Sequence, residues 1–142
     1  MKNNCLQQTL TDNLIFISDA LSNLEHFIFF GTLLGITRNG KPIDNDDDID
    51  IYIDVKHKEK LKNILSDLKP KIKYIDDNPY FLQISTTINN KKGLIDFYFY
   101  INNKNKPYIV EKWNFNGTTN KATSHLHTRK DILFPIKKIP FY

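Results

Sequence analysis

The fold of this 142-residue chain is constrained most strongly by two distant segments in which polar and apolar side chains alternate. Residues 48–55 alternate aspartates and a tyrosine with isoleucine and valine, and residues 95–101 alternate an aspartate and two tyrosines with isoleucine and phenylalanine. Successive side chains of a β-strand point to opposite faces of the sheet. Each segment is therefore predicted to be a strand with one apolar face, and the two strands are expected to lie side by side over a common core.

The polar faces of these strands carry three candidate metal ligands, Asp48, Asp50 and Asp96. Asp48 and Asp50 would lie about 6.6–6.8 Å apart along an extended strand, where like charges repel by about 2–3 kcal/mol at an effective dielectric constant of 20. Water and counterions can offset this repulsion on an open face, whereas Mg²⁺ or Mn²⁺, which bind carboxylate oxygens, would offset it in a cleft. We expect the three aspartates to converge on one side of the sheet as metal ligands and catalytic residues.

A second candidate site precedes the acidic strand. The apolar run Phe27–Phe30 is typical of a strand buried on both faces, and it is followed by Gly31, Thr32 and the helix-compatible residues 33–36. A helix that begins there would offer free backbone N–H groups and the Thr32 hydroxyl to an anion such as phosphate. Arg38 follows near the far end of this helix, where it could bond the last carbonyls or bind a phosphate.

These motifs resemble a known family. A Gly-Thr turn, a short helix, an Asp-hydrophobic-Asp strand and a later lone aspartate are similar to the nucleotidyltransferase (polymerase beta-like) fold. The fuller pattern, dense over the first third of the chain, resembles the LicD/fukutin family of phosphotransferases. The residues that carry this resemblance are Gly31-Thr32-Leu33-Leu34-Gly35, Arg38, Gly40, Ile43 and Asp46-Asp47-Asp48-Ile49-Asp50-Ile51. Asp96 fits the third acidic position, and residues 131–138 resemble a later proline-containing strand of the family.

The resemblance implies a fold, a reaction and a set of partners. We expect an α/β (α+β) domain over residues 1–142, with a small mixed sheet flanked by helices. Members of the family move phosphocholine or a phospho-polyol from a CDP-activated donor to a glycan hydroxyl. The implied roles are metal binding of Mg²⁺ or Mn²⁺ by the three aspartates, and binding of donor phosphates by Gly31, Thr32 and Arg38. A lipid-linked acceptor in glycan or lipopolysaccharide modification would add peripheral contact with a membrane.

The chain departs from the family pattern at two places. Asp44-Asn45 stands where the family usually has Pro-Trp, and the sequence ends at Tyr142, where the family continues. We therefore expect the family's C-terminal part to be absent or to be supplied by another domain.

Two other functions remain open. One is nucleotidyl transfer, in which NMP moves from an NTP to a small molecule or protein and pyrophosphate leaves. The other is a domain without catalytic activity that binds a nucleotide or a partner. The short C-terminus favours this last alternative, and the intact set of aspartates argues against it.

Charge and composition limit the kinds of molecule that the protein is expected to bind. Residues 44–54 hold six of the sixteen acids and no lysine or arginine, so the remainder of the chain has 20 basic and 10 acidic side chains. A concentrated acidic spot in a basic body suits a metal site that receives polyanionic substrates. The lysines occur singly or in pairs, so no nucleic-acid partner is predicted. The single cysteine excludes an internal disulfide, and no apolar run approaches the ~20 residues of a membrane span, so we expect a cytoplasmic protein.

The periodicity of the remaining segments predicts the scaffold. Apolar residues recur at helical spacing over Cys5–Glu25 and Lys56–Lys69. Tyr80–Ile88 alternates as a strand, and the turn at 89–93 would pair it with the Asp96 strand. The tail from Ile132 to Tyr142 is apolar with two prolines, which suits at most an edge strand.

Overall fold

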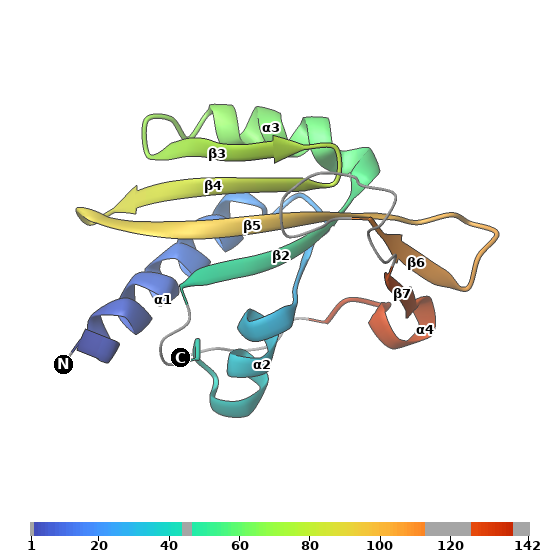
Figure 1. The fold of residues 1–142 in the computed structure, drawn as a ribbon, viewed down its shortest axis with the longest axis horizontal. Helices are drawn as coiled ribbons and strands as arrows, with labels where there is room; N and C mark the ends of the chain where they lie inside the picture. The colour runs from blue at the N-terminus through green and yellow to red at the C-terminus, as the bar shows by residue number, and fades with distance from the viewer. Residues whose placement is uncertain (1, 44–46, 113–125, 138–142) are drawn as a thin grey trace.

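The computed structural model describes residues 2–43, 47–112 and 126–137. Within these segments it contains helices α1–α4, one short 3₁₀ helix and a seven-stranded sheet (Figure 1). In chain order the elements are α1 (Lys2–Ala20), β1 (Phe27–Ile28), α2 (Phe30–Asn39), β2 (Asp48–Asp54), η1 (Val55–His57), α3 (Lys58–Ser66), β3 (Ile72–Asn78), β4 (Phe81–Ile88), β5 (Lys91–Ile101), β6 (Tyr108–Glu111), β7 (Leu126–Arg129) and α4 (Lys130–Leu133).

The sheet is mixed, as expected from the sequence. Its main path runs β1-β2-β5-β4-β3, and β6 pairs with both β5 and β7. β2 and β5 are parallel neighbours, whereas the other pairs are antiparallel. The prediction that the two alternating segments lie side by side is therefore confirmed, and so is the predicted fold class.

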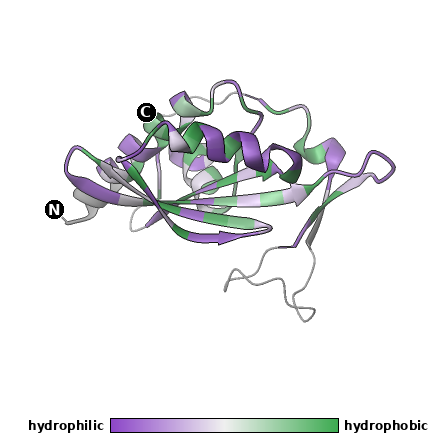
Figure 2. Ribbon diagram, turned by 90° about the horizontal axis from the view of Figure 1, so that it is seen from above, coloured by the Kyte–Doolittle hydropathy of each residue, from purple (hydrophilic) through white to green (hydrophobic). Residues whose placement is uncertain are grey.

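One face of the sheet packs against α1 and α3, which lie on the same side of it (Figure 1). The isoleucines of β2 and the odd-numbered residues of β5 point to this face, as the alternation predicts. Figure 2 shows hydrophobic residues along the strands and hydrophilic ones in the loop between β5 and β6. The buried residues of this main core are Leu10, Leu14, Ile17, Leu21, Leu24, Ile36, Ile49, Ile51, Ile53, Leu61, Leu65, Ile72, Leu82, Ile84, Ile95, Phe97 and Phe99. None of the helices in the described segments combines the length and apolar character that crossing a bilayer requires.

The opposite face is less open than the sequence suggested. We expected it to be charged, but Tyr52, Tyr98 and Tyr100 form a second buried cluster there with Ile109. Partly buried rings and a leucine from β1, the N-cap of α2, β4 and the α4 region pack against it, namely Phe27, Phe29, Phe81, Leu133 and Phe134. Tyr52, Tyr98 and Tyr100 follow Asp50 and Asp96 along β2 and β5, so this cluster covers the later part of both strands, whereas Asp48, Asp50 and Asp96 precede it.

The segment before the acidic strand also differs from expectation. Phe27–Phe30 was predicted to be a strand buried on both faces, but β1 has only two residues, both half-buried, at the edge of the sheet. Helix α2 begins at Phe30, which has a left-handed backbone with φ of 48°. The Phe30 ring packs edge-on against the rings of Tyr52 and Tyr98, at ring-centroid distances of 5.6 and 5.3 Å. These tertiary contacts, rather than strand propensity, decide where the strand ends.

The tail forms no strand in the part that the structure describes. Residues 130–133 form α4, and Phe134 packs its ring edge-on against Phe27 at 6.2 Å. Residues 138–142 lie outside the described segments. The predicted edge strand is thus replaced, up to residue 137, by a short helix that covers the aromatic cluster.

Candidate active site

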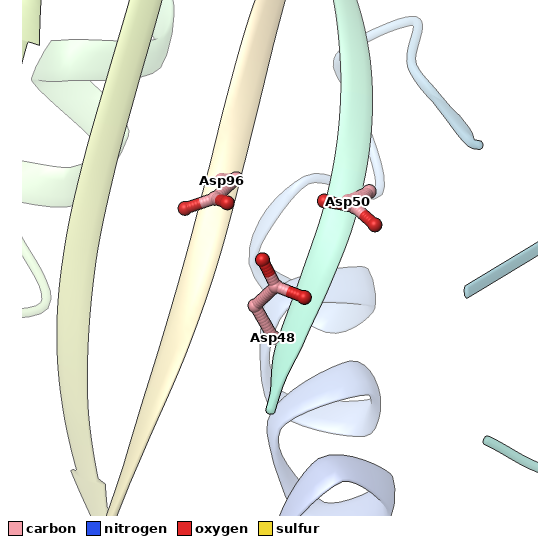
Figure 3. A group of neighbouring side chains, drawn as sticks. All are labelled: Asp48, Asp50 and Asp96. Carbon is pink, nitrogen blue, oxygen red and sulfur yellow. The ribbon is translucent and has the colours of Figure 1, made fainter. Parts of the chain in front are cut away.

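The pairing of β2 with β5 brings the three predicted aspartates together. Asp50 and Asp96 are direct register partners on the two parallel strands, and Asp48 lies one pleat earlier on β2. Each of the three offers a carboxylate oxygen, and these oxygens lie within 4.8 Å of one another (Figure 3). The three aspartates therefore converge on one side of the sheet, as the sequence predicted.

The donor set suits a hard divalent cation. Three carboxylates offer only oxygen ligands, which Mg²⁺ and Mn²⁺ prefer. Asp50 and Asp96 are 6% and 5% exposed, and Asp48 is half-buried. At an effective dielectric constant of 20, each pair of charges about 4.8 Å apart repels by about 3.5 kcal/mol. A cation between the carboxylates would offset this repulsion, so the residues present fit a metal ion.

Asp50 is fixed by its neighbours on three sides. The Phe29 N–H donates to the Asp50 carbonyl at 3.1 Å, and the Asp50 N–H donates to the Thr32 hydroxyl at 2.9 Å. The Tyr98 hydroxyl donates to Asp50 Oδ1 at 3.2 Å. The start of α2 and the middle of β5 therefore hold both the backbone and the side chain of Asp50.

Asp96 is held by a neutral side chain from the next strand. Gln83 on β4 is its register partner, and the Gln83 amide donates to Asp96 Oδ1 at 2.8 Å. Oδ2 is the carboxylate oxygen that this bond leaves for a cation or a proton.

The environment of Tyr98 keeps its hydroxyl protonated. Burial raises the pKa of Tyr98 far above its usual value, and the negative charges of Asp50, Asp96 and Asp48 raise it further. The hydroxyl therefore remains a hydrogen-bond donor to Asp50 at neutral pH.

The predicted substrate-binding residues lie at two ends of α2. Gly31 is half-buried in the first turn, beside Thr32, which is only 1% exposed. The Thr32 hydroxyl accepts from β2, a structural contact that was not foreseen. Arg38 is exposed in the last turn, about 9 Å along the axis from Thr32 at 1.5 Å per residue. The structure therefore brings the start of α2, but not its end, next to Asp50.

Sequence reasoning missed three residues of this site. Gln83 was assigned only to an alternating strand and Tyr98 only to a polar face, although both lie on the face that carries the aspartates. The third is Gly35, where a Cβ atom would lie 2.7 Å from the Ile43 nitrogen and 2.8 Å from the Lys41 carbonyl oxygen. The signal for Gly35 was its place in the Gly-Thr-Leu-Leu-Gly string, and glycine there lets the segment that leads to the acids pack on α2.

The other acids near the site have different positions. Asp47 is exposed before β2, whereas Asp54 is buried at its end and accepts the Lys56 N–H at 3.0 Å as the cap of η1. The Asp44-Asn45 departure from the family pattern lies outside the described residues.

Comparisons with known proteins give a family and a fold. The family model described as LicD/FKTN/FKRP, nucleotidyltransferase domain, matches residues 23–142. The structure is similar to that of the lincosamide antibiotic adenylyltransferase LnuA, solved with lincomycin bound, with a TM-score of 0.60 and 20% sequence identity. This similarity covers 84% of the chain and 69% of LnuA, and it shows a shared fold. No curated protein sequence matches the chain.

Proposed function

Because the chain belongs to the LicD/FKTN/FKRP nucleotidyltransferase-domain family, we propose that it is a metal-dependent phosphotransferase acting on a CDP-activated donor. It moves phosphocholine or a phospho-polyol to the hydroxyl of a glycan or polyol acceptor, and residues 1–142 act as one domain. The observation that supports this proposal most directly is the cluster of Asp48, Asp50 and Asp96 beside the start of α2.

The metal site of the proposal consists of these three aspartates. They would hold Mg²⁺ or Mn²⁺ through their carboxylate oxygens. When bound, the cation supplies positive charge to the phosphate oxygens of the donor and of the departing nucleotide. The two buried carboxylates need little reorganisation for this role, because Gln83 and Tyr98 already hold them.

The remaining roles fall to the protein. The acceptor hydroxyl oxygen forms a bond to the β-phosphorus of the donor, and the bond from that phosphorus to the bridging oxygen breaks, so that CMP leaves with the electron pair. The Asp96 carboxylate accepts the hydroxyl proton. The backbone N–H groups of Gly31 and Thr32 hold donor phosphate at the start of α2, and Arg38 binds the outer part of the donor.

Binding calorimetry tests this proposal directly. CDP-choline and CDP-ribitol are titrated into the native chain, with Mg²⁺ or with EDTA, and into the Asp48→Ala and Asp47→Ala variants. We expect metal-dependent binding of one donor to the native chain and to the Asp47→Ala variant, because Asp47 is exposed before the strand. The Asp48→Ala variant should lose it. Absence of metal-dependent binding to the native chain would refute the proposal.

The structural similarity to an adenylyltransferase favours a second candidate, in which NMP is transferred from an NTP and pyrophosphate leaves. This reaction would use the same aspartates with a different donor. Incubation with each nucleoside triphosphate, followed by assay of pyrophosphate, distinguishes the two reactions. A stable fold that binds neither cation nor donor would instead support a domain without catalytic activity.

A further inference from the structure

We propose that Gln83 and Tyr98 are positioning residues that turn the two buried carboxylates toward the cation. The inference rests on the proposed function, because it assigns these residues to the same metal site. Neither residue belongs to the Gly-Thr or Asp-Ile-Asp motif, and both come from the face of β4 and β5 that carries Asp96.

Gln83 acts on Asp96 across the β4–β5 pair. The two residues are opposite each other in the antiparallel register, where side chains on one face are close enough to bond. The amide donates to Oδ1 at 2.8 Å, which fixes the rotation of the carboxylate. This bond leaves Oδ2 for the cation, in the cluster where one carboxylate oxygen from each of the three aspartates lies within 4.8 Å of the others (Figure 3).

Tyr98 acts on Asp50 across the β2–β5 pair. It lies two residues after Asp96 on β5, so its side chain leaves the same face of the strand. Its hydroxyl reaches Asp50 Oδ1 at 3.2 Å. The ring itself is held between Phe30 and Phe81, each at a centroid distance of 5.3 Å, so the direction of the hydroxyl is fixed by packing.

The chemistry of both donors suits this role. An amide and a phenol hydroxyl supply hydrogen bonds without adding a positive charge that would compete with a cation for the carboxylates. Side chains that orient metal ligands in this way typically change metal affinity by about 10–100-fold when they are removed. Gln83 and Tyr98 therefore shape the metal site without cancelling its charge.

The test compares metal affinity in matched variants. Mn²⁺ binding is measured by electron paramagnetic resonance in the absence of any donor, for the native chain and for the Gln83→Met and Tyr98→Phe variants. Ser85→Ala is the control for Gln83, one pleat away on the same face of β4. Tyr100→Phe is the control for Tyr98, since its buried hydroxyl has no hydrogen-bond partner among the described residues. Thermal unfolding in EDTA reports on the fold of each variant.

We expect the dissociation constant for Mn²⁺ to rise about 10–100-fold in both test variants and to stay unchanged in both controls. Native affinity in the Gln83→Met and Tyr98→Phe variants would overturn the inference while leaving the proposed function intact. If the native chain itself fails to bind Mn²⁺, the proposed function fails. If the Tyr98→Phe variant does not fold, the Gln83→Met variant, which keeps the side-chain volume, tests the inference alone. A raised dissociation constant for Mn²⁺ then supports the inference, and native affinity overturns it.

Discussion

Replacing Asp96 by asparagine should make the metal-free protein more stable and should reduce the stabilisation that the protein gains when it binds metal. The substitution removes one charge from the cluster of three aspartates. It keeps the side-chain shape and the oxygen that accepts from Gln83. A purely structural carboxylate would give the opposite result in the absence of metal, so the sign of the effect distinguishes a metal site from a scaffold contact.

The size of the effect follows from the distances. Asp96 takes part in two of the three repulsive pairs, whose oxygens lie within 4.8 Å. Each pair costs about 0.9 kcal/mol at the dielectric constant of water and about 3.5 kcal/mol at a value of 20. Asp50 and Asp96 are buried and Asp48 is half-buried, so a value between these limits applies, and two pairs at an effective dielectric constant of about 50 give a relief of about 2–3 kcal/mol. The bond from Gln83 weakens by about 1 kcal/mol when its acceptor becomes neutral. The net gain is about 1–2 kcal/mol, or about 3–8 °C in melting temperature.

Thermal unfolding followed by circular dichroism measures both states. In EDTA the Asp96→Asn variant should melt above the native chain. In Mg²⁺ at about one hundred times its dissociation constant, the native chain should gain about 2.7 kcal/mol, and the variant clearly less. As a control, Asp67→Asn at the exposed end of α3 should change stability by less than about 0.5 kcal/mol in either condition. An Asp96→Asn variant that melts below the native chain in EDTA would show that repulsion does not dominate this cluster.

Three further substitutions test the packing around the site. Gly93→Ala should lower the free energy of unfolding in urea by about 2–5 kcal/mol, because the new Cβ would lie 2.0 Å from Nδ2 of the buried Asn13. In an Asn13→Ala background most of this loss should disappear. Purely additive losses from the two substitutions would contradict the mechanism. Gly35→Ala should lower the free energy of unfolding by about 1–2 kcal/mol, after a helix-propensity gain of about 1 kcal/mol. It should also weaken Mn²⁺ binding, since the backbone at Ile43 must move. Unchanged Mn²⁺ affinity would show that the position of this segment does not affect the metal site. Tyr100→Phe should stabilise the fold by about 1 kcal/mol, because the Tyr100 hydroxyl is buried without a hydrogen-bond partner among the described residues. A lower melting temperature of the variant would show that the hydroxyl does form a hydrogen bond in the folded protein.

The period-two pattern made the two central strands predictable. Alternation is a local property, so the sequence alone indicated that Asp48, Asp50 and Asp96 share one face while Ile51 and Phe97 share the other. The apolar face is found as predicted, and the adjacency of the strands brings the aspartates together on the other face, most of which is covered by buried aromatic rings.

Features that depend on distant contacts could not be predicted in this way. The end of β1 is set by the contact of Phe30 with Tyr52 and Tyr98, which are remote in sequence. The role of Gln83 depends on a cross-strand register that its own strand does not encode. The cover over the aromatic cluster includes Phe134, near the other end of the chain. For Gln83 the local pattern predicted the strand, whereas for Phe30 and Phe134 long-range packing also changed the element itself.

The register of the acidic face must therefore be fixed by more than hydrophobic alternation. A slip of one residue between β2 and β5 would bring Asp50 into the main core, so alternation excludes it. A slip of two residues preserves both faces, yet it would move Asp50 about 6.7 Å away from Asp96.

Two further side-chain hydrogen bonds hold β2 in place, in addition to the bond from Tyr98 on β5 to Asp50. Thr32 accepts the Asp50 N–H at 2.9 Å, and the Tyr52 hydroxyl donates to the buried Glu111 at 3.1 Å. Glu111 lies on β6, which pairs with β5, the strand that carries Asp96. The hydrogen bond from Tyr52 to Glu111 therefore fixes the position of β2 along β5. Tyr52 thus sets the one degree of freedom that the apolar face leaves open, whereas Thr32 fixes β2 against α2. This is the physical reason why a hydroxyl is useful at each position even without contact with substrate.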